Sequence, residues 1–522
     1  MRQFVAKHAG QVIGVLSGFD RLVFHGTLRM LAHRGGLMTY LSVMRVLLKD
    51  FADHAHGLTE QLKDASLALA RQTGRPVRYL ASPSANKEEI AREIARADGI
   101  EQGLVCILSA VEPCWSYDIV RDRANKRIEA EPRFRKCLHL YHYQIHPQFG
   151  WMSARIQTWL PFRIQICLNG REWLARSMDA AGLHYVQRDN CFTWLEDPEQ
   201  AQRLMDEQLR SDWPALLGQV ARSLNPQHEA MFAAFPTEYY WSTYQSEWAT
   251  DILFRDPAAL GHLYPRLVQH GLTTFLSPDV LRFLGHKVAP NGRLPPRLEA
   301  EVVSDVKRRP EGVRIKHRVG ENSVKMYDKQ GSVLRVETTI NDVDDFKTFR
   351  SPENKPDAPP SWQRMRKGVA DLHRRAEVSQ AANDRYLQAL ASVDDTTALG
   401  EIAARLCRPA QYEGRRVRAL NPHGPEDAAL LQAIGYGEFA LNGFRNRDIR
   451  ALLFTKPAAD AAEHKRQAAA VSRKLRLLRA HKLIHRVQHT HRYQLTKAGR
   501  VAVTALITAA NANTKELTKL AA

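Results

Sequence analysis

The sequence is poor in the features that mark exported, membrane-spanning and zinc-binding proteins. Its 522 residues include six cysteines, none of them in a Cys-x-x-Cys pair. This argues against a zinc site or a disulfide framework and favours reduced thiols in a cytoplasm. No run approaches the roughly 18 apolar residues that a membrane span requires, and the N-terminus lacks the apolar stretch of a signal peptide. We therefore expect a cytoplasmic protein with no membrane partner.

The motifs of several large enzyme classes are missing as well. The chain has no Walker loop, no GxGxxG fingerprint, no HExxH pair and no nucleophile elbow. NTPases, dinucleotide-dependent enzymes, zincins and α/β-hydrolases are thereby excluded, and no nucleotide or organic cofactor is expected.

Positive charge is abundant and unevenly distributed. Lys and Arg number 75 against 56 Asp and Glu, a formal net charge of +19. Residues 441–522 hold 17 Lys and Arg and 4 Asp and Glu, so 17 minus 4 places +13 in this segment. Such a concentration favours an anionic polymer, DNA or RNA, as the partner.

Residues 466–503 contain the clearest structural pattern. Val471, Leu475 and Leu478 recur at i, i+4 and i+7 and so predict one buried helix face. The opposite side is expected to carry Arg473, Arg476 and Ala480. A strand at 483–484, a polar tip at 489–491 and a returning strand from Tyr493 follow, and 444–454 predict a shorter helix upstream.

The segment SRKLRLLRAHKLI…RYQLTKAGR resembles the reading helix, wing and following helix of MarR-like and ArsR-like winged-helix proteins. The resemblance covers about 80 residues and implies nucleic-acid binding. The residues it points to are Arg473, Lys474, Arg476, Arg479, Lys482, His491 and Arg492. The alternative is a winged helix used only for protein contacts or dimerisation, and the oligomeric state is left open, a dimer included.

The first 195 residues predict a mixed α/β sheet domain. Residues 11–29 alternate around Ser17-Gly18, which favours a β-hairpin with Asp20 at its turn. Asn86 is expected to cap a helix over 87–98. Aromatic strands over 126–169 place Tyr141 and Tyr143 on one sheet face, where they would stack on nucleic-acid bases or serve as half-buried sheet residues. Residues 196–300 are expected to be helical.

Residues 301–345 predict an antiparallel β meander, followed by a linker and charged helix (346–422) and the winged-helix domain (423–522). Within the meander, Tyr327-Asp328-Lys329 and LRVE resemble the "YDK…LRxE" strands of rolling-circle replication initiators. The resemblance implies that Tyr327 attacks a phosphodiester. The alternative is that Tyr327 packs against Arg335 while Glu337 pairs with Lys325 or Lys329.

Phosphodiester chemistry also needs carboxylates that hold a metal ion. Asp20, Glu112 and Asp118 lie at expected strand ends and are the acidic candidates. If the strands of Asp20 and Glu112 were neighbours, the two side chains would share Mg²⁺ or Mn²⁺. The alternative for each is a solvated or capping carboxylate.

The sequence thus predicts an α+β, multi-domain protein: a mixed α/β sheet unit, a helical middle, an antiparallel meander and a C-terminal winged helix. The leading hypothesis is a nucleic-acid-processing protein of a mobile genetic element, of nuclease, transposase or replication-initiator type. Two alternatives are a non-catalytic winged-helix regulator and an RNA-binding subunit of a ribonucleoprotein.

Overall fold

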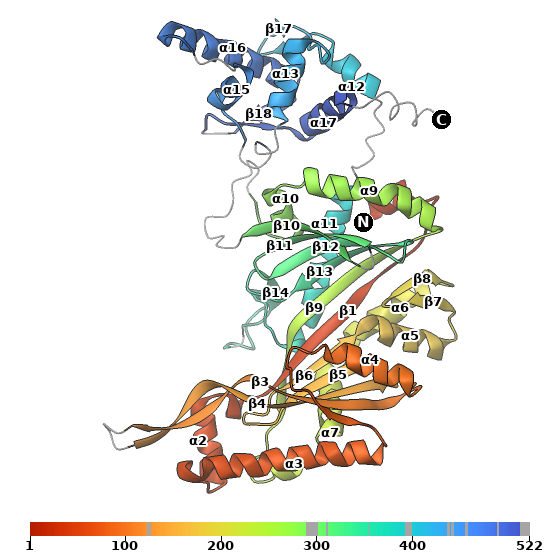
Figure 1. Cartoon of the computed structure of the whole chain (residues 1–522), viewed down its shortest axis with the longest axis vertical. Coiled ribbons are helices and arrows are strands. Elements are labelled where there is room, and N and C mark those ends of the chain that lie inside the picture. The colour runs from red at the N-terminus through yellow and green to blue at the C-terminus, as the bar shows by residue number, and fades with distance from the viewer. Residues whose placement is uncertain are drawn as a thin grey trace. The chain divides into compact units, whose positions relative to one another are not determined.

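The computed structural model of the chain confirms the mixed α+β class (Figure 1). It describes residues 1–122, 127–288, 301–309, 312–352, 354–391, 399–435, 439, 443–454, 458–487 and 490–511. The chain forms two compact units. The first comprises Met1–Val268, Phe283–His286 and Ala300–Ala389, and the second comprises Gln269–Arg282, Lys287–Glu299 and Leu390–Ala522.

A sheet of eleven strands, counted over the described residues, forms the centre of the first unit. Its order is β10-β11-β12-β13-β9-β1-β6-β5-β4-β3-β2, and all neighbours are antiparallel except β2 and β3. The strands are β1 (Val12–Leu28), β2 (Val77–Tyr79), β3 (Gly103–Asp122), β4 (Arg127–His146), β5 (Gly150–Gln157), β6 (Ile164–Asn169), β9 (Tyr239–Phe254), β10 (Val302–Arg309), β11 (Gly312–Val319), β12 (Asn322–Lys329) and β13 (Val333–Ile340).

Helices cover this sheet, and short hairpins extend from it. The helices of the first unit are α1 (Arg2–Lys7), α2 (Arg34–Val43), α3 (Phe51–Gln72), α4 (Lys87–Ala97), α5 (Gly170–Ala181), α6 (Pro198–Glu207), α7 (Trp213–Leu224), α8 (His228–Met231), α9 (Pro257–Thr273), whose last residues belong to the second unit, and α11 (Leu372–Leu390). Helix α10 (Ser277–Phe283) belongs almost entirely to the second unit. The hairpins pair β7 (Tyr185–Arg188) with β8 (Cys191–Leu195) and β14 (Lys347–Arg350) with β15 (Ser361–Arg364). Asn86 caps α4 as predicted, because its side chain accepts from the Glu89 N–H.

One face of the sheet is buried over its central strands. Under β1 and β4 to β6 it packs on α2, α3 and α7, in a core that includes Phe24, Leu58, Ile156 and Leu217. Under β9 and β13 the same face meets α11, whose Asn383 side chain hydrogen-bonds Trp248 O and Thr338 Oγ1. The opposite face is covered only in part, by α4 over Cys106, Leu108 and Tyr143 and by α5 and α6 over Leu16 and Leu253.

Two sequence predictions in the first unit are wrong. Residues 12–28 form one long strand without a turn at Ser17-Gly18, and Asp20 lies within that strand. Residues 239–254, expected to be helical, form the long strand β9 between β1 and β13. From Trp248 to Phe254 every residue of β9 is buried, because helices cover both sides of the sheet here. A strand buried on both faces loses its polar alternation and so resembles a core helix in the sequence.

The antiparallel meander at 301–345 is confirmed, since β10 to β13 pair in sequence order. It is not a separate domain, because β13 pairs with β9 from Val333 to Ile340. The expected units 1–195, 196–300 and 301–345 therefore contribute to one sheet. Sequence periodicity indicates strands and does not specify their non-local neighbours.

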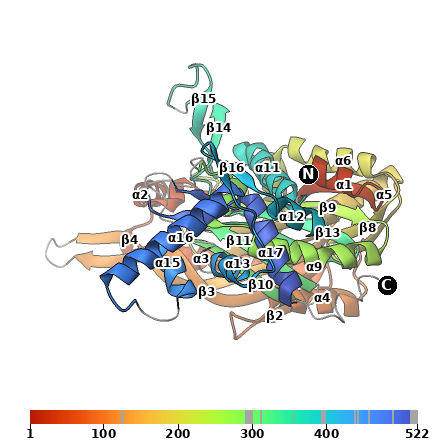
Figure 2. The ribbon, with the colours of Figure 1, turned by 90° about the horizontal axis from the view of Figure 1, so that it is seen from above.

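The second unit is mainly helical. Its further elements are α12 (Leu399–Leu406), β16 (Ala410–Tyr412), β17 (Arg415–Val417), α13 (Pro425–Ile434), α15 (Asn446–Leu453), α16 (Ala461–Ala480), β18 (Ile484–Arg486), β19 (Tyr493–Leu495) and α17 (Lys497–Asn511). Viewed from above, α13, α15, α16 and α17 lie together (Figure 2). Val471, Leu475 and Leu478 are buried in the core of this unit, as their spacing predicts.

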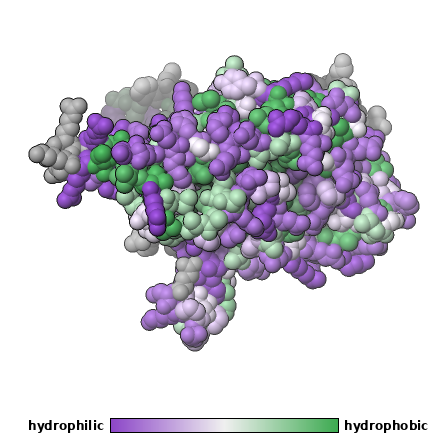
Figure 3. Space-filling model, turned by 90° about the horizontal axis from the view of Figure 1, so that it is seen from below, coloured by the Kyte–Doolittle hydropathy of each residue, from purple (hydrophilic) through white to green (hydrophobic). Residues whose placement is uncertain are grey.

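None of the helices in the described part of the chain combines the length and the hydropathy of a membrane span. Seen from below, the surface is mostly hydrophilic, with hydrophobic residues in small scattered groups (Figure 3).

Candidate functional site

The partly covered side of the large sheet is lined with polar and charged side chains, and we call it the polar face. Residues directly opposite one another in antiparallel strands point to the same side. Following the registers across the sheet, the polar face carries Asp305, Lys316, Lys325, Glu337, Glu247, Arg21, Gln165, Arg155, Tyr141 and Glu112. The polar side chains therefore extend across the sheet and are not confined to a solvent-exposed edge strand.

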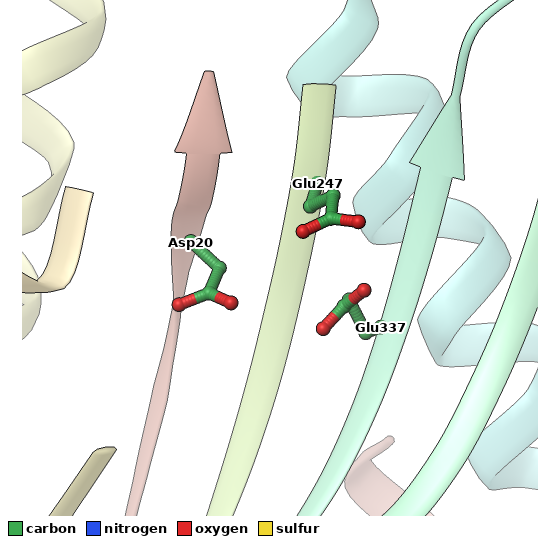
Figure 4. Close-up of side chains that lie close together, drawn as sticks. All are labelled: Asp20, Glu247 and Glu337. Atoms are coloured by element: carbon green, nitrogen blue, oxygen red, sulfur yellow. The ribbon is translucent and has the colours of Figure 1, made fainter. Parts of the chain in front are cut away.

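Three carboxylates meet at the centre of the polar face, and we call them the acidic cluster. They are Asp20 on β1, Glu247 on β9 and Glu337 on β13, and their ligand oxygens all lie within 4.8 Å of one another (Figure 4). The strands are immediate neighbours in the order β13-β9-β1. Asp20 lies at a β-bulge between Phe19 and Arg21, and a bulge redirects a side chain that a regular strand would fix.

Lys325 on β12 is the cation closest to this cluster. Its Nζ lies 3.2 Å from Glu247 Oε1 and 2.7 Å from Glu337 Oε1. The Tyr327 hydroxyl, on the same strand, donates to Glu337 Oε2. Glu337 is thus held from two sides, whereas the Glu247 side chain retains 16% of its exposure and provides the more open side of the cluster.

A second layer of charge fixes Asp20. Arg335 is fully buried and forms a bidentate pair with Asp251, at 2.5 Å from Nε and 2.8 Å from Nη2. Its Nη1 lies 3.3 Å from Asp20 Oδ2. The Asn190 side chain, in the β7–β8 turn, donates to both oxygens of Asp20 at 3.1 and 3.0 Å. These contacts orient the Asp20 carboxylate.

Burial and mutual repulsion shift the pKa values of the three acids in different directions. Burial raises the pKa of Asp20, and Arg335 opposes this. Burial, followed by repulsion from Glu337, raises the pKa of Glu247 to about 7 against the pull of Lys325. Burial also raises the pKa of Glu337, but the opposing effects of Lys325 and the Tyr327 hydroxyl are larger, so the pKa of Glu337 is lowered. Glu247 therefore exchanges a proton near neutral pH.

The donor set of the cluster fits a hard divalent cation. Carboxylate oxygens are the ligands that Mg²⁺ and Mn²⁺ prefer. Lys325 supplies one positive charge to two of the three acids, so a divalent ion would compete with Lys325 for Glu247 and Glu337. The cluster is the only set of three metal-ligating side chains at this spacing within the residues the structure describes.

The predicted pairing of Asp20 with Glu112 is wrong. Their strands are separated by β6, β5 and β4. Glu112 instead accepts from the Tyr141 hydroxyl at 2.5 Å and pairs with Lys87 at 3.0 Å and Arg155 at 3.1 Å. Glu337 lies within the LRVE segment that was noted in the sequence. Glu247 was missed, because β9 was interpreted as a helix.

The other two predicted catalytic residues lie in contrasting places. Asp118 forms ion pairs with Arg133 and Arg135 on the β3–β4 hairpin and contributes nothing to the cluster. Tyr327 lies beside the cluster, but burial, followed by repulsion from Glu337, raises its pKa well above the usual value. The phenol donates a proton to Glu337 and is not poised as a nucleophile. The alternative interpretation holds: Tyr327 is paired with Arg335, and Glu337 with Lys325.

Tyr141 and Tyr143 share the polar face as the sequence predicts, but neither is free to stack on a base. Tyr143 is buried against α4 and contacts the Trp151 ring. Tyr141 lies between Lys87 and Arg155, with its hydroxyl on Glu112. The structure thus favours the alternative of half-buried sheet residues.

In the second unit, some of the residues of α16 that were predicted to contact nucleic acid instead contact other side chains of the protein. Arg473 is exposed, whereas Lys474 pairs with Glu426 at 3.1 Å. Arg479 lies over the Tyr412 ring at 4.9 Å, and the Nε of Arg476 is buried without a hydrogen-bond partner. Ala480, expected on the charged side, is buried, because the β16–β17 hairpin packs near this end of the helix.

The hairpin after α16 has the predicted strands, β18 and β19, and the first residue of its polar tip, His489, lies outside the described residues. Lys482 and His491 are exposed, and Arg492 donates to Gly443 O at 3.4 Å. The prediction missed Lys465 and Arg466, which are exposed on the N-terminal half of α16. The available signal was that two adjacent cations precede the first apolar position, Val471, in the same helix.

In comparisons with family models, with curated proteins and with solved structures, the chain has no significant match. What the protein does is therefore inferred from its own residues.

Proposed function

We propose that the protein binds nucleic acid through its second unit, with α16 as the element that enters a groove. The observation that carries the proposal is the division of α16 into two faces. Val471, Leu475 and Leu478 enter the core, while Lys465 and Arg466, as well as Arg473, point to solvent. Long cations on an exposed helix face are suited to phosphate contacts.

The order of elements supports a winged-helix arrangement. α15 precedes α16, and the β18–β19 hairpin follows it. Phe444, just before α15, forms an isolated antiparallel bridge with Tyr493 of β19 and so ties the start of α15 to the hairpin. In helix-turn-helix proteins the N-terminal residues of the second helix contact the bases. Lys465 and Arg466 occupy that position here. The target is DNA or RNA.

We propose, as a second function, phosphodiester processing at the acidic cluster, of the nuclease, transposase or replication-initiator type found in mobile elements. Asp20, Glu247 and Glu337 would hold Mg²⁺ or Mn²⁺. Such an ion polarises a phosphoryl oxygen and lowers the pKa of bound water. Glu247 exchanges a proton near neutral pH, Tyr327 orients Glu337, and Arg335 with Asn190 orients Asp20. The three acids, Tyr327 and Arg335 come from the polar face, and Asn190 reaches Asp20 from the β7–β8 turn.

Nucleic-acid binding is tested by fluorescence anisotropy of the full-length protein with duplex DNA, single-stranded DNA and RNA over a series of salt concentrations. Arg466→Ala with Arg473→Ala should weaken binding and lower the salt slope by about two, one per lost phosphate contact. Arg405→Ala, on the exposed side of α12 in the same unit, is the matched control. Unchanged affinity in the double variant would refute the role of α16.

Processing is tested by incubating each nucleic acid with Mg²⁺ or Mn²⁺. Asp20→Asn and Glu337→Gln should abolish cutting while binding through the second unit persists. Asp118→Asn, whose partners Arg133 and Arg135 lie elsewhere, should cut normally. Sequence-specific duplex binding without cutting in either metal would instead identify a non-catalytic regulator. Co-purification of RNA without cutting would identify a ribonucleoprotein subunit.

A further inference from the structure

A pocket of about 180 Å³ also opens on the polar face, and we call it the arginine pocket. Strands β1, β4, β5 and β6 contribute its polar lining. The side chains that matter are His25, His139, Arg155, Arg163 and Gln165. It lies on the same side of the sheet as the acidic cluster, because His25 shares one face of β1 with Arg21, and Arg21 is opposite Glu247 in register. Five residues separate the two, or about 16 Å at about 3.3 Å per strand residue.

Positive charge in this pocket is only partly neutralised. Arg155 pairs through one amino group with Glu112 at 3.1 Å, but its Nε is buried and has no hydrogen-bond partner. The Arg163 side chain is exposed and makes no ion pair with any residue that the structure describes. One carboxylate therefore faces two guanidinium groups. Arginine presents its donors as a fork that matches the oxygens of a phosphate.

The titrating groups around the pocket respond to this charge. Burial, and then Arg155 and Arg163, lower the pKa of His25. Burial, with Arg155 next, lowers the pKa of His139 to about 4. The hydrogen bond with Cys137 lowers the pKa of the Cys114 thiol, and Arg155 lowers it further against burial. Both imidazoles are therefore neutral at pH 7, which leaves the arginines as the source of positive potential.

An aromatic platform lies at the rim. The Tyr244 ring stacks on His25 at 4.4 Å between centroids with an interplanar angle of 14°, and Tyr244 is 57% exposed. One side of the tyrosine ring meets His25, so the other is available to a planar partner. An exposed aromatic ring beside a cationic pocket is the combination that single-stranded nucleic acids use, because bases stack while phosphates pair with cations.

We propose that the arginine pocket holds a backbone phosphate of a single nucleic-acid strand, one base of which stacks on Tyr244, and that this strand continues along β1 to the acidic cluster. Arg21, which is exposed and adjacent to Glu247 in register, lies between the two sites. The inference rests on the proposed phosphodiester function, for which it supplies the substrate class. The strand would lie on the open part of the polar face between α4 and the α5–α6 pair.

The test is the affinity of the full-length protein for a fluorescein-labelled single-stranded oligonucleotide, measured in the Arg466→Ala, Arg473→Ala background so that binding by α16 is suppressed. Adding Arg163→Ala should weaken this residual binding about tenfold and lower the salt slope by about one. Arg163→Lys should recover part of the affinity. Arg71→Ala, on α3 over the opposite face of the sheet, should change nothing.

The proposed stacking of a base on Tyr244 is tested separately. Tyr244→Ala should lower the affinity, whereas Tyr244→Phe should retain it, because stacking uses the ring and not the hydroxyl. Crosslinking with an oligonucleotide that contains 4-thiothymidine should label the peptide around Tyr244. Equal affinity in Arg163→Ala and in the parent would overturn the pocket proposal even if Mn²⁺-dependent cutting is found. Weakened binding without any cutting would support the pocket and refute phosphodiester processing.

Discussion

Replacing Glu247 with Gln should stabilise the protein at alkaline pH while removing a proposed ligand of the metal ion. The pKa of Glu247 is raised from 4.5 to about 7 by burial and by repulsion from Glu337. An acid whose pKa is higher in the folded state binds its proton more tightly when folded. The free energy of unfolding therefore falls as pH rises between about 4.5 and 7.

The magnitude follows from the shift. A difference of about 2.5 pH units at about 1.36 kcal/mol each corresponds to at most about 3 kcal/mol of stability lost above pH 7. Glutamine keeps the shape of a protonated glutamate and cannot ionise. The stability of Glu247→Gln should thus be close to that of the parent near pH 5, approach it further at lower pH, and exceed it by about 3 kcal/mol at pH 8.

Urea unfolding at pH 5, 6, 7 and 8, followed by tryptophan fluorescence, measures this difference. Glu238→Gln changes an exposed glutamate just before β9 and serves as the control, with a pH profile parallel to that of the parent. A Glu247→Gln protein that is less stable than the parent at pH 8 would show that the Lys325 pair outweighs the repulsion. The reasoning about the acidic cluster would then be wrong.

Three further substitutions test other parts of the structure. Arg335→Met removes the ion-pair partner of buried Asp20 and leaves buried Asp251 with Arg171 alone, and it should lower the free energy of unfolding by about 3–5 kcal/mol in urea titrations; a loss below 1 kcal/mol would contradict the buried pair. Gly443→Ala should destabilise the second unit in thermal scans, because Gly443 has a φ of +62° and an added Cβ would lie 2.5 Å from Tyr493 O; an unchanged melting transition would argue against the Phe444–Tyr493 pairing. In thermal scans, Mn²⁺ should raise the melting temperature of Lys325→Met more than that of the parent, since the competing cation is gone. Equal increases in the two proteins would show that Lys325 does not compete with the ion.

Local patterns in the sequence were enough to locate several elements. The i, i+4, i+7 spacing of Val471, Leu475 and Leu478 specified the buried face of α16, because one face of that helix remains in solvent. Asn86 marked the start of α4 through its cap. The turns after Val319 and Lys329 divided β11, β12 and β13, since each strand is short and bounded by turn residues. In each case the determining contacts are close in sequence.

The tertiary structure alone decided which strands are neighbours, and with them the candidate site. Asp20, Glu247 and Glu337 are separated by more than 80 residues along the chain, and their approach depends on β9 inserting between β1 and β13. No local feature of the sequence indicates that pairing, and burial on both faces removed the polar alternation that would have identified β9 as a strand. Hence the composition predicts an anionic partner, and the long-range pairing of the sheet determined which acids lie together.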